Sequence, residues 1–143
     1  MTVARILATK GRDVITTQPH RTLHEVAKIL AEKHIGAIVV TGADHDVVGI
    51  LSERDIVKAV AKKGASALED AVSRHMTARV VTTTLSSTIN SLMEAMTGGR
   101  FRHVPVVQNG RLEGVVSIGD VVAHRLADIE TESQALREYI ASA

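Results

Sequence analysis

Apolar residues recur along the chain in short runs typical of strands and in longer spacings typical of helices. Two sets follow the i, i+3, i+4, i+7 spacing of one helix face, namely Leu23, Val26, Ala27 and Leu30, and then Ile89, Leu92, Met93 and Met96. A β-branched run before each set, at 14–17 and 80–83, predicts a short strand. An aliphatic run after each set, at 35–40 and 101–106, predicts another. The same order of elements is therefore expected twice.

A repeated phrase closes each of these halves. It is Gly-Ile-Leu-Ser-Glu-Arg-Asp-Ile-Val at 49–57 and Gly-Val-Val-Ser-Ile-Gly-Asp-Val-Val at 114–122. A repeat of this kind indicates two copies of one small unit. Each half is predicted as strand, helix, strand, strand, helix, and because about 60 residues bury little surface alone, the two halves should share a core.

Local signals place the ends of several elements. Thr22 with Glu25 three residues later has the spacing of a capping box and predicts a helix start. Gly64 predicts the end of the helix that follows Asp55, and the Gly98-Gly99 pair predicts the end of the second-half helix. Residues 64–76 are expected to connect the halves, and Asn109-Gly110 predicts a tight hairpin turn.

The chain continues past Asp120 without a further glycine or proline. Apolar or small residues step by four and three, which predicts one long helix with a seam, at Val122, Leu126, Ile129, Ser133, Leu136 and Ile140. Such a seam either covers its own domain or packs on a second subunit.

Composition limits the classes of function. The 143 residues are 45% hydrophobic but include one Phe, one Tyr and no Trp, so the core should be aliphatic. A net charge of +1 from interspersed signs argues against nucleic-acid binding. No apolar stretch approaches the roughly 20 residues of a membrane helix, and a cytoplasmic location is expected. The absence of cysteine excludes disulfides and thiol chemistry.

The chain lacks the common sequence patterns of catalytic and metal-binding sites. His20 and His24 could share a helix face, but no third ligand has suitable spacing, so no metal site is predicted. Neither a phosphate-binding P-loop nor a Gly-x-Ser-x-Gly elbow occurs. We therefore expect no catalytic residues and a protein that is not an enzyme.

The two Gly-h-h-Ser-x-x-Asp phrases (h is aliphatic), together with Val104-Pro105-Val106, resemble a tandem pair of CBS domains, the cystathionine β-synthase type of regulatory module. The resemblance covers nearly the whole chain. It implies an α+β fold of two β-α-β-β-α repeats about a pseudo-twofold axis, here followed by the long terminal helix. It also implies clefts for adenosyl ligands, AMP, ATP or NAD(H) before S-adenosylmethionine, with no required cofactor.

Residue chemistry fits such a ligand. Asp55 and Asp120 can each accept hydrogen bonds from both hydroxyls of a ribose. Ser52 and Ser117, three residues earlier, would add hydroxyls where a strand meets a helix and backbone amides attract phosphate. The same spelling is also a capping box, and the two roles can coexist.

Basic residues are the candidates for phosphate contacts. In the second half they are Arg100, Arg102 and His103, and the resemblance implies that Arg102 and His103 face phosphates; a purely solvated role is the alternative. The first half has Gly36 and Ala37 at the matching positions and only Arg54 beside Asp55. Either the two clefts differ in their preference for phosphate, or they share Arg54 and Arg102 across the pseudo-twofold axis. Of the two clefts, the one at Asp120 is favoured for a phosphorylated ligand. Two strand threonines, Thr16 and Thr82, are possible contacts of the adenine.

The expected organisation is a first repeat at 1–66, a second at 67–124 and a helical extension at 125–143. The predicted function is a sensor that couples adenine-nucleotide binding to the arrangement of the two repeats. The alternative is a structural or dimerisation module with vestigial clefts. We expect a homodimer and an unidentified protein target, without nucleic acid or membrane.

Overall fold

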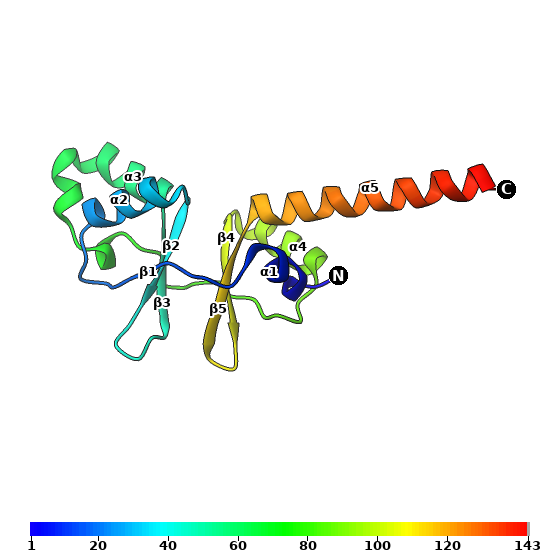
Figure 1. The fold of residues 1–143 in the computed structure, drawn as a ribbon. Coiled ribbons are helices and arrows are strands. Elements are labelled where there is room, and N and C mark those ends of the chain that lie inside the picture. The colour runs from blue at the N-terminus through cyan, green and yellow to red at the C-terminus, as the bar shows by residue number, and fades with distance from the viewer. Residues whose placement is uncertain (143) are drawn as a thin grey trace.

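A computed structural model describes residues 1–142 as two αβ halves that lie side by side, followed by a long helix (Figure 1). The first half contains β1 (Thr16–Thr17), α2 (Leu23–Lys33), β2 (Ala37–Thr41), β3 (Val47–Ser52) and α3 (Glu53–Lys63). Two short 3₁₀ helices, η1 (Ala65–Glu69) and η2 (Val72–Arg74), follow. The second half contains α4 (Ile89–Gly99), β4 (His103–Gln108), β5 (Arg111–Ser117) and α5 (Ile118–Ser142), and α1 (Val3–Lys10) precedes all of these.

The strands form two small sheets next to each other, with their hairpins pointing the same way (Figure 1). The first sheet has the order β1-β2-β3, in which β1 runs parallel to β2 and β2 antiparallel to β3. The second contains β4 and β5, antiparallel, joined through Asn109 and Gly110, which both have positive φ. The two predicted repeats and the predicted hairpin turn are confirmed.

The first strand of the second repeat is shorter than expected. Residues 80–83 were predicted as a strand, but only Thr83 pairs, as a single parallel bridge to Val106. Its amide donates to the Pro105 carbonyl at 3.0 Å, and its carbonyl accepts from the Val107 amide at 2.8 Å. Proline has no N–H, so Pro105 cannot extend this ladder toward Val81.

The helix ends follow the local signals with one difference. Thr22 accepts from the Glu25 amide as the helix cap, but the Glu25 carboxylate contacts Arg21 instead of completing a capping box. The helix α4 ends at Gly99, as the Gly98-Gly99 pair predicts, and Arg100 takes the left-handed conformation with φ 56°. Gly64 ends α3 as predicted.

The leading segments of the two repeats are exchanged. Val3, Ile6 and Leu7 of α1 are buried in the core of the second half, with residues such as Ile89 and Val104. Ala67 and Val72, from the predicted connection, are buried in the core of the first half. The repeat boundary at residue 66 stays a prediction. Residues before it pack in the core of the second half, and residues after it pack in the core of the first half.

Equivalent hydrogen bonds hold both exchanged segments. The Val3 amide donates to the Ser87 carbonyl at 2.9 Å, and the Val72 amide donates to the Arg21 carbonyl at 2.7 Å. Each segment then presses on the glycine that opens the repeated phrase. A Cβ on Gly114 would lie 2.9 Å from Leu7 Cδ2, and a Cβ on Gly49 would lie 2.5 Å from Met76 Sδ. A side chain at either glycine would therefore force Leu7 or Met76 to shift.

The terminal helix α5 is confirmed, and its far half extends away from the rest of the protein (Figure 1). Only Val121 of this helix is buried. The sequence left open whether the seam covers its own domain, and within residues 1–142 it does not: Val122, Leu126, Ile129, Leu136 and Ile140 are between 46% and 65% exposed.

Candidate functional site

A cavity of about 700 Å³ lies between the two halves, within the size range of small-molecule sites. Its wall comes from four segments: the strand ends and the start of α3 in the first half, the chain at 77–81, the chain at 99–103, and the start of α5. Both repeats therefore contribute to one site.

The start of α3 carries the repeated Ser and Asp. The Asp55 amide donates to Ser52 Oγ at 3.3 Å, and Asp55 Oδ2 accepts from the Ser52 amide at 2.8 Å. This reciprocal pair is a complete capping box, and the structural role weighed from the sequence is confirmed. All hydrogen bonds recorded for this carboxylate in residues 1–142 go to Oδ2, so Oδ1 is available to a ligand.

The segment at 77–81 lines the cavity beside Asp55. Thr77 forms an antiparallel bridge with Ile50, and each amide donates to the other's carbonyl, at 3.0 and 2.9 Å. This anchor sets the direction of Arg79, Val80 and Val81 along the cavity wall. Val81 is 48% exposed, which is unusual for valine in a core but suitable for an apolar ligand surface.

Positive charge dominates the lining. Five cations surround the cavity, against only two carboxylates, Glu53 and Asp55; the cations are Arg54, Lys58, Arg79, Arg100 and Arg102. None of the five takes part in an ion pair among residues 1–142. The amino terminus of the 25-residue helix α5 also lines the cavity, through Ile118 and Gly119, and adds its positive dipole end. The site is suited to an anion.

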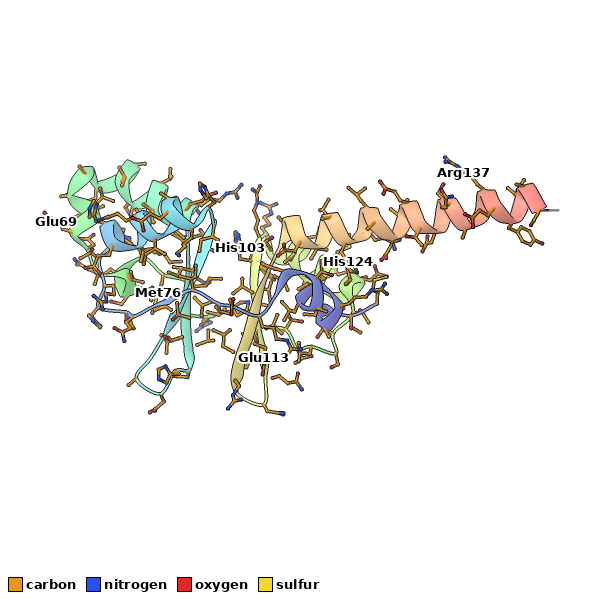
Figure 2. All side chains as sticks on the ribbon, viewed as in Figure 1. Glu69, Met76, His103, Glu113, His124 and Arg137 are labelled. Atoms are coloured by element: carbon orange, nitrogen blue, oxygen red, sulfur yellow. The ribbon has the colours of Figure 1, made fainter. Side chains whose placement is uncertain are left out.

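His103 lies at the junction of the two halves (Figure 2). Gly36 provides the room, because a Cβ there would lie 3.3 Å from His103 Nε2. Burial, with the positive charge of Lys10, lowers the pKa of His103 below its ordinary 6.5, although Glu53 and Asp120 oppose the shift. The imidazole is therefore neutral at pH 7, and the arginines carry the positive charge of the cavity.

Asp120 has a different environment from Asp55. It makes the same cap, accepting from the Ser117 amide at 2.9 Å, but Lys10 Nζ also lies 2.6 Å from its Oδ2. Burial would raise the pKa of Asp120, but the hydrogen bonds from Lys10 and from the Ser117 amide lower it overall. Lys10 comes from the exchanged helix α1, so the carboxylate already has a counter-ion within the chain.

Seven of the ten predicted site residues line the cavity: Ser52, Arg54, Asp55, Arg100, Arg102, His103 and Ser117. Three do not, namely Thr16, Thr82 and Asp120. Thr16 is an exposed residue of β1, paired with Val39, and Thr82 is exposed outside the strands. The basic residues of the second half line the cavity that contains Arg54 and Asp55, as in the alternative in which the clefts share Arg54 and Arg102, and not a separate cleft at Asp120. The reason is that the cavity spans the two repeats.

Sequence reasoning missed Lys58, Thr77, Arg79 and Val81. Only the packing of the exchanged segments identifies Arg79 as a site residue. Leu7 and Met76 are the equivalent residues that press on the two glycines, and a basic residue follows each by three positions, Lys10 and Arg79. Of these two equivalent cations, Lys10 pairs with Asp120 and Arg79 lines the cavity that contains Asp55.

The arrangement offers a carboxylate oxygen, an apolar wall and unpaired arginines within one cavity. A ligand with a diol, a flat apolar group and a phosphate would satisfy all three. Among residues 1–142, no group of three or more His, Cys, Asp or Glu could hold a metal ion, and no helix is long and apolar enough to cross a membrane.

Comparison with known proteins agrees with this architecture. The CBS domain family matches residues 3–62 and 70–127, so each match begins in an exchanged segment. A CBS-domain-containing protein of Agrobacterium tumefaciens, ATU1752, is 54% identical over 87% of this chain and 99% of its own, with a TM-score of 0.85.

Two similar structures were solved with adenosyl ligands. PAE2072 from Pyrobaculum aerophilum, complexed with AMP, is 31% identical over 84% of this chain and 89% of its own, with a TM-score of 0.75. The CBS domain pair of protein MJ0100, in complex with 5'-methylthioadenosine and S-adenosyl-L-methionine, is 25% identical over 90% and 98%, with a TM-score of 0.80.

Proposed function

The chain belongs to the CBS-domain family and contains a pair of CBS domains, and from this premise we propose that it is a regulatory module that binds one adenine nucleotide in the cavity at Asp55. The observation that carries the proposal is that one cavity combines Asp55, the valines at 80–81 and five cations that form no ion pair among residues 1–142.

Each part of a nucleotide has a partner in this proposal. Asp55 Oδ1 accepts from the ribose hydroxyls, since Oδ2 is occupied by the cap. Val80 and Val81 cover one face of the adenine. Phosphate oxygens lie between Arg102 and the amino terminus of α5, where a free helix end and a guanidinium both favour anions.

The choice of ligand follows from the charge. The excess of cations favours AMP, ADP, ATP or NAD(H), which carry phosphate, over S-adenosylmethionine, whose sulfonium is positive. PAE2072, with AMP, supports the first class, and the MJ0100 pair supports adenosyl ligands in general. A cytoplasmic location and a protein target stay predictions.

Regulation would arise from linkage. The ligand contacts Ser52 and Asp55 of the first repeat together with Arg102 of the second, so it favours one arrangement of the two repeats over others. A partner that distinguishes the arrangements would respond to nucleotide concentration. No reaction is required of the site, and we propose no catalysis.

Calorimetry with thermal denaturation tests this proposal. AMP, ADP, ATP, NAD, NADH and S-adenosylmethionine are each titrated into the full chain. A phosphorylated ligand should bind with one site per chain and raise the melting temperature, as binding to the native state requires. If none of the six binds or stabilises, the clefts are vestigial and the structural alternative is correct. Turnover of ATP or NADH by the protein alone would contradict a sensor without catalysis.

A further inference from the structure

The exposed apolar seam of α5 and the charged residues beside it fit one particular partner. We propose that α5 forms a parallel, in-register, two-stranded coiled coil with α5 of a second copy of this chain. Its core would be the six residues that step by four and three: Val122, Leu126, Ile129, Ser133, Leu136 and Ile140.

The seam does not face the rest of its own chain. The near part of α5 packs through Val121, which is buried, and His124, whose Nε2 lies 2.8 Å from Met1 Sδ. Successive residues of a helix are rotated by about 100°, so the centre of the seam lies about 100° around the helix from Val121. A second helix can therefore reach the seam without displacing α1 or α4.

Charged residues flank the seam in an alternating order. Arg125 and Glu132 lie on one flank, the g positions, while Glu130 and Arg137 lie on the other, the e positions. In a parallel pair, each g residue lies beside the e residue five positions later in the partner helix. Arg125 would then meet Glu130 of the second copy, and Glu132 would meet Arg137, so all four pairs across the twofold axis are attractive.

The opposite orientation loses this match. An antiparallel pair that buries the whole seam places Glu130 beside Glu130 and Glu132 beside Glu132, and like charges that face each other are destabilising. It also places Ser133 against Ile129. The parallel arrangement instead places the polar Ser133 opposite its own copy, and a single polar core residue of this kind fixes register at a cost in stability.

The flanking charges are not used within the chain. None of the four takes part in an ion pair among residues 1–142. Figure 2 shows Arg137 on the far half of α5, where no other element is near. Apolar and charged groups of this part of the helix are thus both available to a partner.

Disulfide trapping tests the orientation directly, because the chain contains no cysteine. The full chain is oxidised as Ile140→Cys and, as the matched control, as Glu138→Cys, which lies on the outer face of the coil. A disulfide requires Cα atoms within about 7 Å. The parallel coil brings the two copies of position 140 together, so Ile140→Cys should form covalent dimers and Glu138→Cys should not.

The antiparallel outcome is equally visible. It would separate the two copies of position 140 by about 27 Å along the helix and would bring position 140 beside position 122. A Val122→Cys/Ile140→Cys variant, analysed by mass spectrometry, should show only 140–140 and 122–122 links. A link between 122 and 140, or no more cross-linking of Ile140→Cys than of the control, overturns the proposal.

Charge exchange tests the pairing itself. Glu132→Lys should weaken self-association by roughly 3- to 10-fold in analytical ultracentrifugation, because it reverses two attractive pairs. Adding Arg137→Glu should restore it, since the pairs are attractive again with opposite signs. A protein that is monomeric at high concentration, or a double variant that is no better than Glu132→Lys, contradicts the proposal.

Discussion

The two repeats provide a matched pair of substitutions for testing the nucleotide site. Asp55→Asn and Asp120→Asn change equivalent residues of the repeated phrase. Each asparagine keeps a side-chain oxygen that can accept from the serine amide of its cap, so both variants should remain folded. They differ in position: Asp55 lines the cavity, whereas Asp120 lies outside it and is paired with Lys10.

The expected magnitude follows from the lost hydrogen bonds. A hydrogen bond to a charged group contributes about 1.5–3 kcal/mol, and 1.4 kcal/mol corresponds to a tenfold change in affinity. Asp55→Asn should therefore weaken the binding of AMP or ATP by roughly 10- to 100-fold. Asp120→Asn should change the affinity by less than about threefold, because Asp120 lies outside the cavity and its partly exposed ion pair with Lys10 contributes little.

Isothermal titration calorimetry measures both variants against the unmodified chain. Circular dichroism confirms that each variant is folded. The assignment of the site to Asp55 is refuted if Asp120→Asn loses as much affinity as Asp55→Asn, or if Asp55→Asn binds normally.

Three further predictions concern stability and pH. Leu7→Ala should lower the free energy of unfolding by about 2–5 kcal/mol, measured by urea denaturation. Gly114→Ala should destabilise the Leu7→Ala variant less than the unmodified chain, because its Cβ would lie 2.9 Å from Leu7 Cδ2. Equal losses in the two backgrounds would contradict this packing. Hydrogen bonds from Lys63 and His75 lower the pKa of Asp70 to about 2. The ionised carboxylate should therefore stabilise the fold above about pH 4, and this stabilisation should be lost as pH falls toward 2. In an acid titration, the stability of Asp70→Asn should fall less steeply with pH than that of the unmodified chain. Burial lowers the pKa of His103 below 6.5, so the imidazole gains its proton only at more acidic pH. NAD, whose diphosphate does not titrate in this range, should then bind more tightly, and His103→Gln should reduce that gain in calorimetry.

The repeat made much of the fold predictable. Helix faces such as Leu23, Val26 and Leu30 are buried as their spacing predicts, because a regular period identifies the face that must leave water. The capping role of Ser52 and Asp55 could also be predicted from the sequence, since it depends on two residues three positions apart. Hydrogen bonds between residues that are close along the chain can therefore be predicted from the sequence.

The exchange of leading segments was not predictable in the same way. Val3 and Leu7 could pack on either half, and only contacts distant in sequence decide between them. The composition of the cavity depends on the same choice, because Arg79 reaches it only after Met76 has packed on Gly49. Thr16 and Thr82 were candidates because of their predicted strand positions, but the wall beside Asp55 is formed by the chain at 77–81, which pairs only through Thr77.

The exchanged helices also make the two repeats interdependent. A chain cut near Gly64 would yield one fragment that carries α1, which completes the core of the other, and one that begins with the segment that completes the core of the first. Neither fragment could close its own interior, yet together they hold every contact of the intact chain. Each half thus needs the other to complete its core, and the folding of the two halves should be as cooperative as that of an obligate dimer.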